Sequence, residues 1–306
     1  MITDDKIKSN VTTKISIGFP VYNGEEFLKK KIDSLLNQNF KDFEIIISDN
    51  GSTDGTYDIC KEYEKRDNRI KYFRQEENHG AVHNYNFVLQ KAKYDYFVWT
   101  AADDNLLPGF LEKNLSVLEL NNKLVGSMTT QLSYGTIENK FKKINALLKK
   151  IGLSFRPYFN YSITEKNYDD RIRIFMKKMP WPLFYGVYRT DSARKSFPNT
   201  TMVGFDGIFI LNALKYGGIN LIDEPLFVAY AEGGQSKGMI YLAKEFNTSK
   251  IGKIFPYYPF VSYMSKRLER KTFLKSLDLF LRLIFDGNFL IFIDIMFRLK
   301  SKIFRS

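Results

Sequence analysis

The fold is decided by residues 15–56, which read ISIGFPVYNGEEFLKKKIDSLLNQNFKDFEIIISDNGSTDGT. Alternating apolar residues predict a strand over 14–21, and apolar residues at helical spacing predict a helix directly after it. Asn23 stands three residues before Glu26, which is the spacing of a capping box, so we expect Asn23 to cap this helix. The unbroken apolar run at 43–48 predicts a second strand, covered on both faces as in a parallel sheet.

The same alternation continues to residue 100. Strands are predicted at 70–74 and 94–100, with helices over 57–63 and 81–92 between the strands. This order predicts an α/β fold with an open, mostly parallel central sheet flanked by helices. A polar segment follows each of the four strands, namely VYNGEE, SDNGSTDGT, QEENHG and AADDN. Because ligands bind outside the carboxyl ends of such strands, we expect these four segments to converge on one rim.

Cysteine and histidine are scarce in the 306 residues, which contain only Cys60, His79 and His83. A single cysteine excludes an intrachain disulfide and a cysteine-based metal cluster. Two histidines argue against a histidine-rich zinc site. Any bound metal is therefore expected to be held mainly by oxygen ligands.

The formal net charge is +12, and half of this excess lies in residues 264–306, which carry ten Lys or Arg against four Asp or Glu. Basic residues alternate there with Phe, Leu and Ile, a pattern typical of amphipathic helices at an anionic membrane surface. Gly287 and Asn288 are expected to divide this tail into two helices. Packing on the rest of the chain and formation of a homodimer are the alternatives. No aromatic and basic readout motif is present, so no nucleic-acid partner is expected.

Two adjacent carboxylates, Asp103 and Asp104, follow the strand at 94–100. Divalent cations such as Mg²⁺ prefer carboxylate oxygens, and neighbouring residues can point to opposite sides of a turn. We assign Asp104 to a metal ion, and Asp103 to the metal and a nucleotide. The alternative is that the pair only caps the helix beginning near Pro108. Asp49 ends another strand on the same rim, where its carboxylate could accept a hydrogen bond from a base.

Three segments resemble the family-2 glycosyltransferases. Residues 15–56 are similar to the opening run of the family, NHGAVHNYNFVLQKAKYDYFVWTAADDNLLPGFL resembles its central donor segment, and VGFDGIFILNALKYGG resembles its acceptor-side segment. Together they cover roughly residues 14–120 and 180–230, in the expected order. The resemblance implies the GT-A fold, in which a Rossmann-like half binds a nucleotide sugar, followed here by a C-terminal helical appendage.

The resemblance also implies the roles of individual residues. The residues expected to line the nucleotide-sugar site are Pro20, Val21, Tyr22, Glu25, Asp49, Asn84 and Asp103. Asp103 and Asp104 correspond to a variant DXD motif that binds Mn²⁺ or Mg²⁺. Asp206 is the implied catalytic base of a single displacement that inverts the anomeric carbon. Trp181 and Tyr185 are candidates for the acceptor region.

Three features depart from the family pattern, one being His83, which stands where the family frequently has an arginine. Ala101 stands where the family often has an acid, and the segment AYAEGGQSKG lacks a histidine that can complete the metal site. A non-catalytic relative that binds a sugar or nucleotide is therefore one alternative. The other is a nucleotidyltransferase of related architecture, which usually needs a Gly-rich loop with Arg or Lys after the first strand. The segment VYNGEEFL lacks such a loop.

We therefore expect an N-terminal lead at 1–13, a catalytic domain at 14–240 and an amphipathic helical region at 241–306. Within the catalytic domain, the nucleotide-binding half is expected at 14–120 and the acceptor half at 121–240. The expected enzyme is a hexosyltransferase of surface polysaccharide synthesis with a UDP-linked donor and a saccharide or lipid-linked saccharide acceptor. The lead has no apolar signal-peptide core, so a cytoplasmic location, peripheral on the membrane, is expected.

Overall fold

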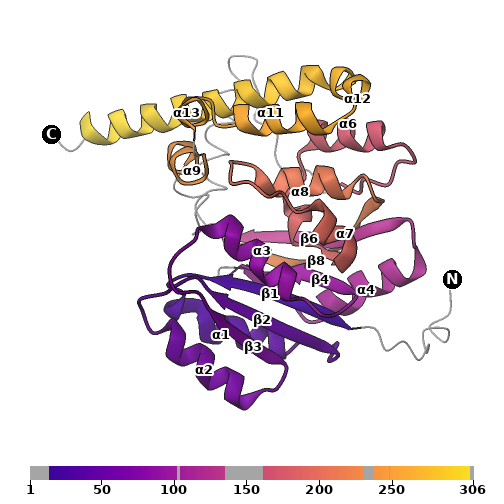
Figure 1. The fold of residues 1–306 in the computed structure, drawn as a ribbon, viewed down its shortest axis with the longest axis vertical. Helices are drawn as coiled ribbons and strands as arrows, with labels where there is room; N and C mark the ends of the chain where they lie inside the picture. Colours follow the sequence, from indigo (N-terminus) through magenta and orange to yellow (C-terminus); the bar gives the residue numbers. More distant parts are fainter. Residues whose placement is uncertain (1–13, 102–103, 135–160, 231–237, 248, 304–306) are drawn as a thin grey trace.

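The computed structural model describes residues 14–101, 104–134, 161–230, 238–247 and 249–303 (Figure 1). Its sheet has eight strands in the order β3-β2-β1-β4-β7-β6-β8-β5. The strands are β1 (Ile15–Val21), β2 (Phe43–Asp49), β3 (Ile70–Arg74), β4 (Tyr96–Trp99), β5 (Asp104–Leu106), β6 (Leu124–Tyr134), β7 (Val187–Arg189) and β8 (Gly218–Tyr230).

Helices lie on both faces of the sheet and beyond its second half (Figure 1). The helices in the order of the chain are α1 (Glu25–Leu36), α2 (Thr56–Arg66), α3 (Ala81–Lys91), α4 (Phe110–Leu120), α6 (Tyr168–Lys178), the 3₁₀ helix η2 (Trp181–Tyr185), α7 (Thr190–Ser196), α8 (Phe205–Ala213), α9 (Met239–Phe246), α10 (Lys250–Ile254), α11 (Tyr258–Arg267), α12 (Arg270–Lys275) and α13 (Leu277–Ile303).

The first four strands of the order are parallel, as the sequence predicts. β1 pairs in parallel with β2 and β4, and β2 pairs in parallel with β3. The rest of the sheet is mixed, because β7 runs antiparallel to both β4 and β6, and β5 runs antiparallel to β8. The predicted α/β class is confirmed, and the parallel pairing is continuous only in the half that ends at β4.

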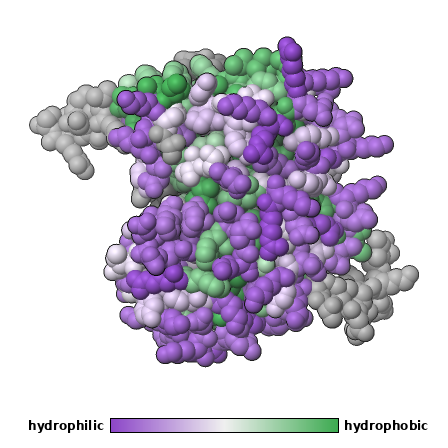
Figure 2. Space-filling view, viewed as in Figure 1, coloured by the Kyte–Doolittle hydropathy of each residue, from purple (hydrophilic) through white to green (hydrophobic). Residues whose placement is uncertain are grey.

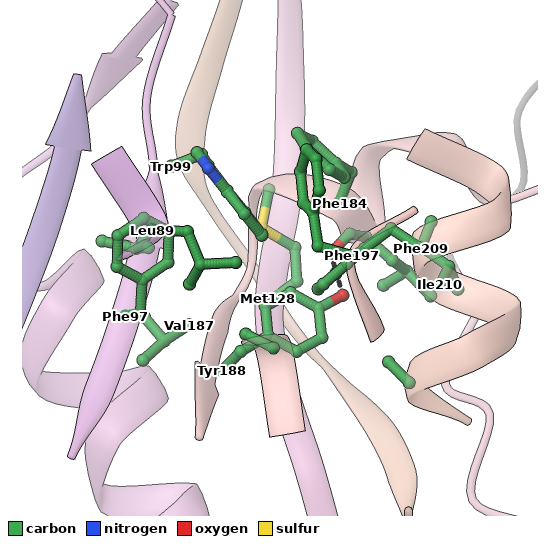
Figure 3. Packing of buried hydrophobic residues seen from close by; sticks show 14 of the residues in the cluster. Leu89, Phe97, Trp99, Met128, Phe184, Val187, Tyr188, Phe197, Phe209 and Ile210 are labelled. Carbon is green, nitrogen blue, oxygen red and sulfur yellow. Dashed lines mark hydrogen bonds between the residues drawn. The ribbon is translucent and has the colours of Figure 1, made fainter. Parts of the chain in front are cut away.

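An aromatic cluster joins the two halves of the sheet (Figure 3). Trp99, the last residue of β4, stacks on Phe184 with 4.7 Å between ring centroids and meets Phe209 of α8 edge to face at 4.9 Å. Tyr188 of β7 also meets Phe209 edge to face, and its hydroxyl donates to the Leu183 carbonyl at 2.6 Å. These rings are buried, so η2 and α8 are fixed above the carboxyl end of β4.

The predicted capping box at the start of α1 is wrong. Asn23 has a positive φ of 49° and does not cap the helix with its side chain. Its carboxamide oxygen instead accepts a hydrogen bond from the backbone N–H of Thr53, at 2.9 Å. Asn tolerates this left-handed backbone better than most residues, so it serves as a turn residue that connects two loops.

The predicted break at Gly287 and Asn288 is also wrong, since α13 is continuous from Leu277 to Ile303. A Cβ at Gly287 would lie 2.6 Å from the ring of Tyr257. The glycine therefore permits close packing of α13 against the start of α11, and tertiary contact outweighs the low helix propensity of glycine. Among the described residues, no helix combines the length and the apolar content that crossing a bilayer requires.

Candidate active site

The loops after β1 and β2 are locked together at the carboxyl end of the sheet. Three backbone N–H groups of the first loop donate to side chains of the second: Asn23 to Ser52 at 2.8 Å, Gly24 to Thr56 at 2.9 Å and Glu25 to Asp54 at 3.1 Å. In return, the Glu25 carboxylate accepts from the N–H of Gly55 at 2.9 Å. Glu25 is thus a structural residue that holds the rim, in addition to its predicted place beside the nucleotide.

Asp54 is the carboxylate that accepts hydrogen bonds from backbone groups of both loops. Burial opposes its ionisation, but hydrogen bonds from Thr56 and from the backbone of Glu25 outweigh that effect and hold the pKa of Asp54 below its ordinary value. A carboxylate that accepts several N–H bonds is stabilised in its charged form. The rim is therefore rigid and preorganised at neutral pH.

Asp49 is fully buried at the end of β2. One carboxylate oxygen accepts from the N–H of Ser52 at 2.8 Å, and the other accepts from the hydroxyl of Tyr72 at 2.7 Å. The guanidinium of Arg74 lies 3.9 Å from the second oxygen. Burial and the Asp49 charge raise the pKa of Tyr72, which keeps this hydroxyl a donor. Asp49 fixes the loop that follows β2 and presents negative charge at the base of the rim.

Asn84 of α3 is 3% exposed and joins the ends of two strands. Its amide nitrogen donates to the carbonyl of Ser48 at 2.9 Å and to the carbonyl of Val21 at 3.3 Å. Its side-chain oxygen is buried and has no hydrogen-bond partner among the described residues. Because buried polar atoms are normally paired, this oxygen is suited to accept a hydrogen bond from a bound ligand.

The end of β1 offers one exposed aromatic surface. Pro20 and Val21 are buried, whereas the side chain of Tyr22 is 48% exposed. Tyr22 therefore has a ring face free for a planar group such as a base, while Pro20 and Val21 form part of the floor beneath it.

Asp104 begins β5 and is buried at the edge of the sheet. Its backbone carbonyl accepts a hydrogen bond from the ammonium group of Lys31, which is itself buried in α1. The hydroxyl of Thr100, at the end of β4, is also buried and has no partner among the described residues. Asp103 lies outside the described residues.

These oxygen donors fit a hard divalent cation such as Mn²⁺ or Mg²⁺, the metals expected from the sequence. In the part of the chain that the structure describes, no group of three His, Cys, Asp or Glu side chains forms a complete metal cluster. A cation bound at Asp104 would therefore need further oxygens, from Asp103 or from a bound diphosphate.

Asp206 stands in the first turn of α8, after Gly204 with a φ of 82°. Its carboxylate accepts the N–H of Gly207 at 2.9 Å. Burial nevertheless raises the pKa of Asp206 from 3.8 to about 6, because desolvation outweighs this hydrogen bond. A carboxyl group with such a pKa is basic enough to remove a proton and still ionised at neutral pH.

Tyr185 connects the surroundings of Asp104 and Asp206. Its ring stacks on Phe227 of β8 at 5.5 Å, and β8 pairs with β5, which begins at Asp104. On the other side, its hydroxyl oxygen lies 3.4 Å from the hydroxyl oxygen of Tyr85. The ring of Tyr85 in turn packs on the residue that precedes Asp206, with 5.8 Å between centroids. Tyr185 thus lies between the strand that pairs with β5 and the residue that precedes Asp206.

Trp181 is used mainly for packing. Its ring stacks on Tyr257 of α11 at 6.4 Å and meets Phe175 of α6 edge to face at 5.7 Å. A Cβ at Gly207 would overlap the same ring. These contacts cover much of the aromatic ring that the sequence suggested for the acceptor region. Trp181 therefore joins α8 to the C-terminal helices.

Lys31 is the residue near this site that sequence reasoning missed. It lies on the buried face of α1 together with Leu28, Ile32 and Leu35. A lysine in the apolar repeat of a helix is a signal, because lysine is almost never fully buried without a partner. The partner, the carbonyl of Asp104, is 73 positions away in the chain and cannot be inferred from the repeat alone.

A family model described as Glycosyl transferase family 2 matches residues 16–184. A Campylobacter jejuni protein named GalNAc(5)-diNAcBac-PP-undecaprenol beta-1,3-glucosyltransferase is 40% identical over 164 residues, which are 50% of this chain and 53% of that protein. An uncharacterized glycosyltransferase of Haemophilus influenzae is 40% identical over 111 residues, which are 36% of this chain and 44% of that protein. The matches cover less than two thirds of each relative.

Two solved structures have a similar fold. The S. aureus TarS fragment 1-349 in complex with UDP-GlcNAc has a TM-score of 0.55 at 18% identity, covering 90% of this chain and 80% of that one. The mannosyltransferase PcManGT from Pyrobaculum calidifontis, in complex with GDP-Man and Mn²⁺, has a TM-score of 0.53 at 14% identity, covering 89% and 73%. At these identities the likeness shows the fold alone, and it confirms the expected GT-A architecture.

Proposed function

The chain belongs to glycosyl transferase family 2 and is a glycosyltransferase. We propose that it transfers the sugar of a nucleotide-linked donor with inversion of the anomeric carbon. The observation that carries this proposal is the geometry of the rim. Tyr185 stacks on Phe227 of β8, the strand that pairs with β5, and its hydroxyl contacts Tyr85, whose ring packs on the residue that precedes Asp206. The pKa of the Asp206 carboxyl group is raised to about 6. Family membership also favours glycosyl transfer over nucleotidyl transfer.

We place the nucleotide at the ends of β1 and β2, with the base against Tyr22. The side-chain oxygen of Asn84 has no hydrogen-bond partner among the described residues and could accept from the nucleotide, and Asp49 stabilises the loop around the base. UDP is the proposed nucleotide, and the complex of TarS with UDP-GlcNAc supports this choice through a shared fold. The floor residues Pro20 and Val21, and Glu25 with its hydrogen bond to the second loop, keep this surface in place.

The proposed cofactor is Mn²⁺ or Mg²⁺, held by Asp104 together with Asp103. When bound there, a divalent cation would neutralise the charge that grows on the leaving diphosphate. The hydrogen bond from Lys31 to the Asp104 carbonyl fixes the start of β5. Lys31 therefore supports the site from within the protein and does not need to touch the donor.

Asp206 is the proposed base. As an acceptor hydroxyl attacks the anomeric carbon, the Asp206 carboxylate takes its proton, and the diphosphate leaves from the opposite face of the sugar. Tyr185 lies next to this position through its contact with Tyr85 and is proposed to line the acceptor side. Trp181 is assigned a supporting role, because its ring packs against Gly207 and Tyr257.

The proposed acceptor is a saccharide carried on a lipid. The Campylobacter jejuni relative is named for transfer to an undecaprenol-linked glycan, which supports this class of acceptor. We propose residues 14–240 as the catalytic domain, with the donor half at 14–120, and residues 241–306 as a helical region attached to it. A lipid-linked acceptor would require this enzyme to work at the surface of a membrane.

Calorimetric titration tests the donor site directly. UDP, GDP, CDP and dTDP are titrated with and without Mn²⁺ into the wild type, into Asp104→Ala, and into Asp223→Ala as a matched carboxylate control exposed on β8. We expect metal-dependent binding of one nucleotide, UDP, to the wild type and the control, and its loss in Asp104→Ala. Absence of binding to a folded wild type would contradict the proposal.

A further inference from the structure

The C-terminal helices present a continuous apolar stripe to solvent. Its members lie on α12 and α13 and are each between 44% and 63% exposed: Leu274, Leu281, Phe285, Phe292, Ile295 and Met296. The spacing within α13 is four, seven, three and one residues, which keeps these side chains on one face of the helix. Figure 2 shows hydrophobic residues gathered along the upper edge of the molecule, over α12 and α13 of Figure 1.

The opposite face of α13 is anchored in the protein, so the stripe has a fixed orientation. Phe280 is buried and stacks on Phe273 with 5.0 Å between centroids. Farther along, the carboxylate of Asp294 accepts the backbone N–H of Ile240 at 2.9 Å and thereby caps α9. Because α13 is held at Phe280 and at Asp294, the described residues leave the stripe exposed.

Positive charge surrounds the start of the stripe. Lys266 and Arg267 in the last turn of α11, and Arg270 and Lys271 at the start of α12, are exposed. On α13, Arg282 is 42% exposed and lies 3.6 Å from Asp286. Residues 264–306 carry a net charge of +6. Basic side chains beside exposed Leu and Phe are suited to lie at a surface of anionic headgroups over an apolar layer.

We propose that α12 and α13 dock in the plane of an anionic lipid bilayer, with the stripe facing the acyl chains and the basic residues among the headgroups. A second copy of the chain fits the stripe less well, because it would bring two regions of +6 charge together. The acidic residues on α13 have partners within the protein: Asp278 lies 3.3 Å from Arg173, Asp286 lies 3.6 Å from Arg282, and Asp294 accepts the N–H of Ile240. The consequence that docking brings a lipid-linked acceptor to the enzyme rests on the proposed function.

Vesicle sedimentation tests the docking. The full chain is mixed with vesicles of phosphatidylcholine, or of phosphatidylcholine and phosphatidylglycerol, at low and at high salt. The wild type is expected to bind the anionic vesicles, and less so at high salt. The double variant Leu281→Glu/Phe285→Glu should lose at least about tenfold in affinity, because two large apolar side chains no longer insert. Leu120→Glu, on the exposed end of α4, is the matched control and should bind like the wild type.

Two outcomes would overturn the proposal. The first is equal vesicle binding by the double variant and the wild type. The second is a wild type that binds no vesicles, together with light scattering that shows a wild-type dimer and a monomeric double variant. Circular dichroism of each variant verifies that it is folded. UDP titration of the same samples separates docking from the proposed function. A protein that binds vesicles but no nucleotide would contradict the proposed enzyme activity and leave the docking proposal standing.

Discussion

At the scale of a single residue, the burial of Asp206 has opposing effects on the basicity of its carboxyl group and on the stability of the fold. Its burial raises the carboxyl pKa to about 6, which makes it a stronger base than an exposed aspartate. The same burial makes the charged form costly, because the low-polarity surroundings replace water. A group that is unfavourable for folding and suited to proton transfer is the pattern expected at a catalytic position.

The pH dependence of activity follows from this pKa. The proposed base works only as the carboxylate, so kcat should rise as pH increases through about 6 and level off above it. Asp206→Asn should lower kcat by about 10²- to 10⁴-fold without changing nucleotide affinity. Initial rates against pH, together with UDP titration of the variant, measure both effects. A rate that is flat between about pH 5 and pH 7, roughly one unit on each side of the pKa, would contradict the role of Asp206.

The stability of the same variant should depend on pH with a defined sign. Since the folded-state pKa of about 6 exceeds the ordinary value of 3.8, the contribution of Asp206 to stability is greatest below 3.8 and is lost as pH rises through about 6. Asp206→Asn removes the charge and should stabilise the protein by about 1–3 kcal/mol at alkaline pH. Urea unfolding should show this gain above pH 7 and little of it near pH 4; a gain independent of pH would contradict the explanation.

At the scale of elements, α8 and η2 meet through a glycine. Gly207 has no side chain, and the Trp181 ring occupies the space where a Cβ would stand. The Trp181 ring also stacks on Tyr257, with 6.4 Å between ring centroids. Trp181 therefore joins α8, η2 and the start of α11. The position of α8 therefore depends on a packing fit between segments that are distant in the sequence.

A double-mutant cycle tests this fit. Gly207→Ala should destabilise the protein by about 1–3 kcal/mol, because the methyl group overlaps a ring that is packed on its other side. Trp181→Ala alone should cost about 3–5 kcal/mol, as expected when a large aromatic side chain is removed. With the ring absent, Gly207→Ala should have almost no further effect on unfolding free energy. Additive costs would show that the two residues do not interact.

At the scale of the whole molecule, the C-terminal helices complete the catalytic core. Phe260 and Met264 of α11 are fully buried and belong to the same apolar cluster as Ile208 and Phe209 of α8. The apolar tail predicted from composition therefore has two faces with different roles. One face packs on the rest of the chain, which the sequence analysis gave as an alternative to membrane binding. The other face is the exposed stripe.

Deletion of residues 249–306 should consequently prevent stable folding, because it removes buried side chains of α11 and exposes the Trp181 ring. The expected result is an aggregated chain, or one that lacks a cooperative thermal transition. Deletion of residues 2–13, the lead predicted from sequence, is the control and should leave the transition unchanged. A soluble chain that ends at residue 248 and binds UDP like the wild type would contradict this prediction.

The first half of the fold was predictable because its signals are local. Buried parallel strands such as β2 are continuous apolar runs, and each strand end carries a polar segment that can be read directly. The antiparallel joint at β7 was not predictable, because its three residues obtain their stability from neighbours on β4 and β6. The same reason explains the continuous α13, where Tyr257 packs on a glycine that by itself suggests a helix break.

The sequence by itself determined the α/β class, the family, the rim at the strand ends and the candidates Asp49, Asp104 and Asp206, since these depend on residue types at fixed spacing. Only the tertiary structure decided what each carboxyl group touches. Asp49 became a structural acceptor, Asp104 gained the ammonium of Lys31, and Asp206 acquired its raised pKa. The physical reason is that hydrogen bonding and desolvation depend on neighbours brought together by packing, which no local pattern of residues contains.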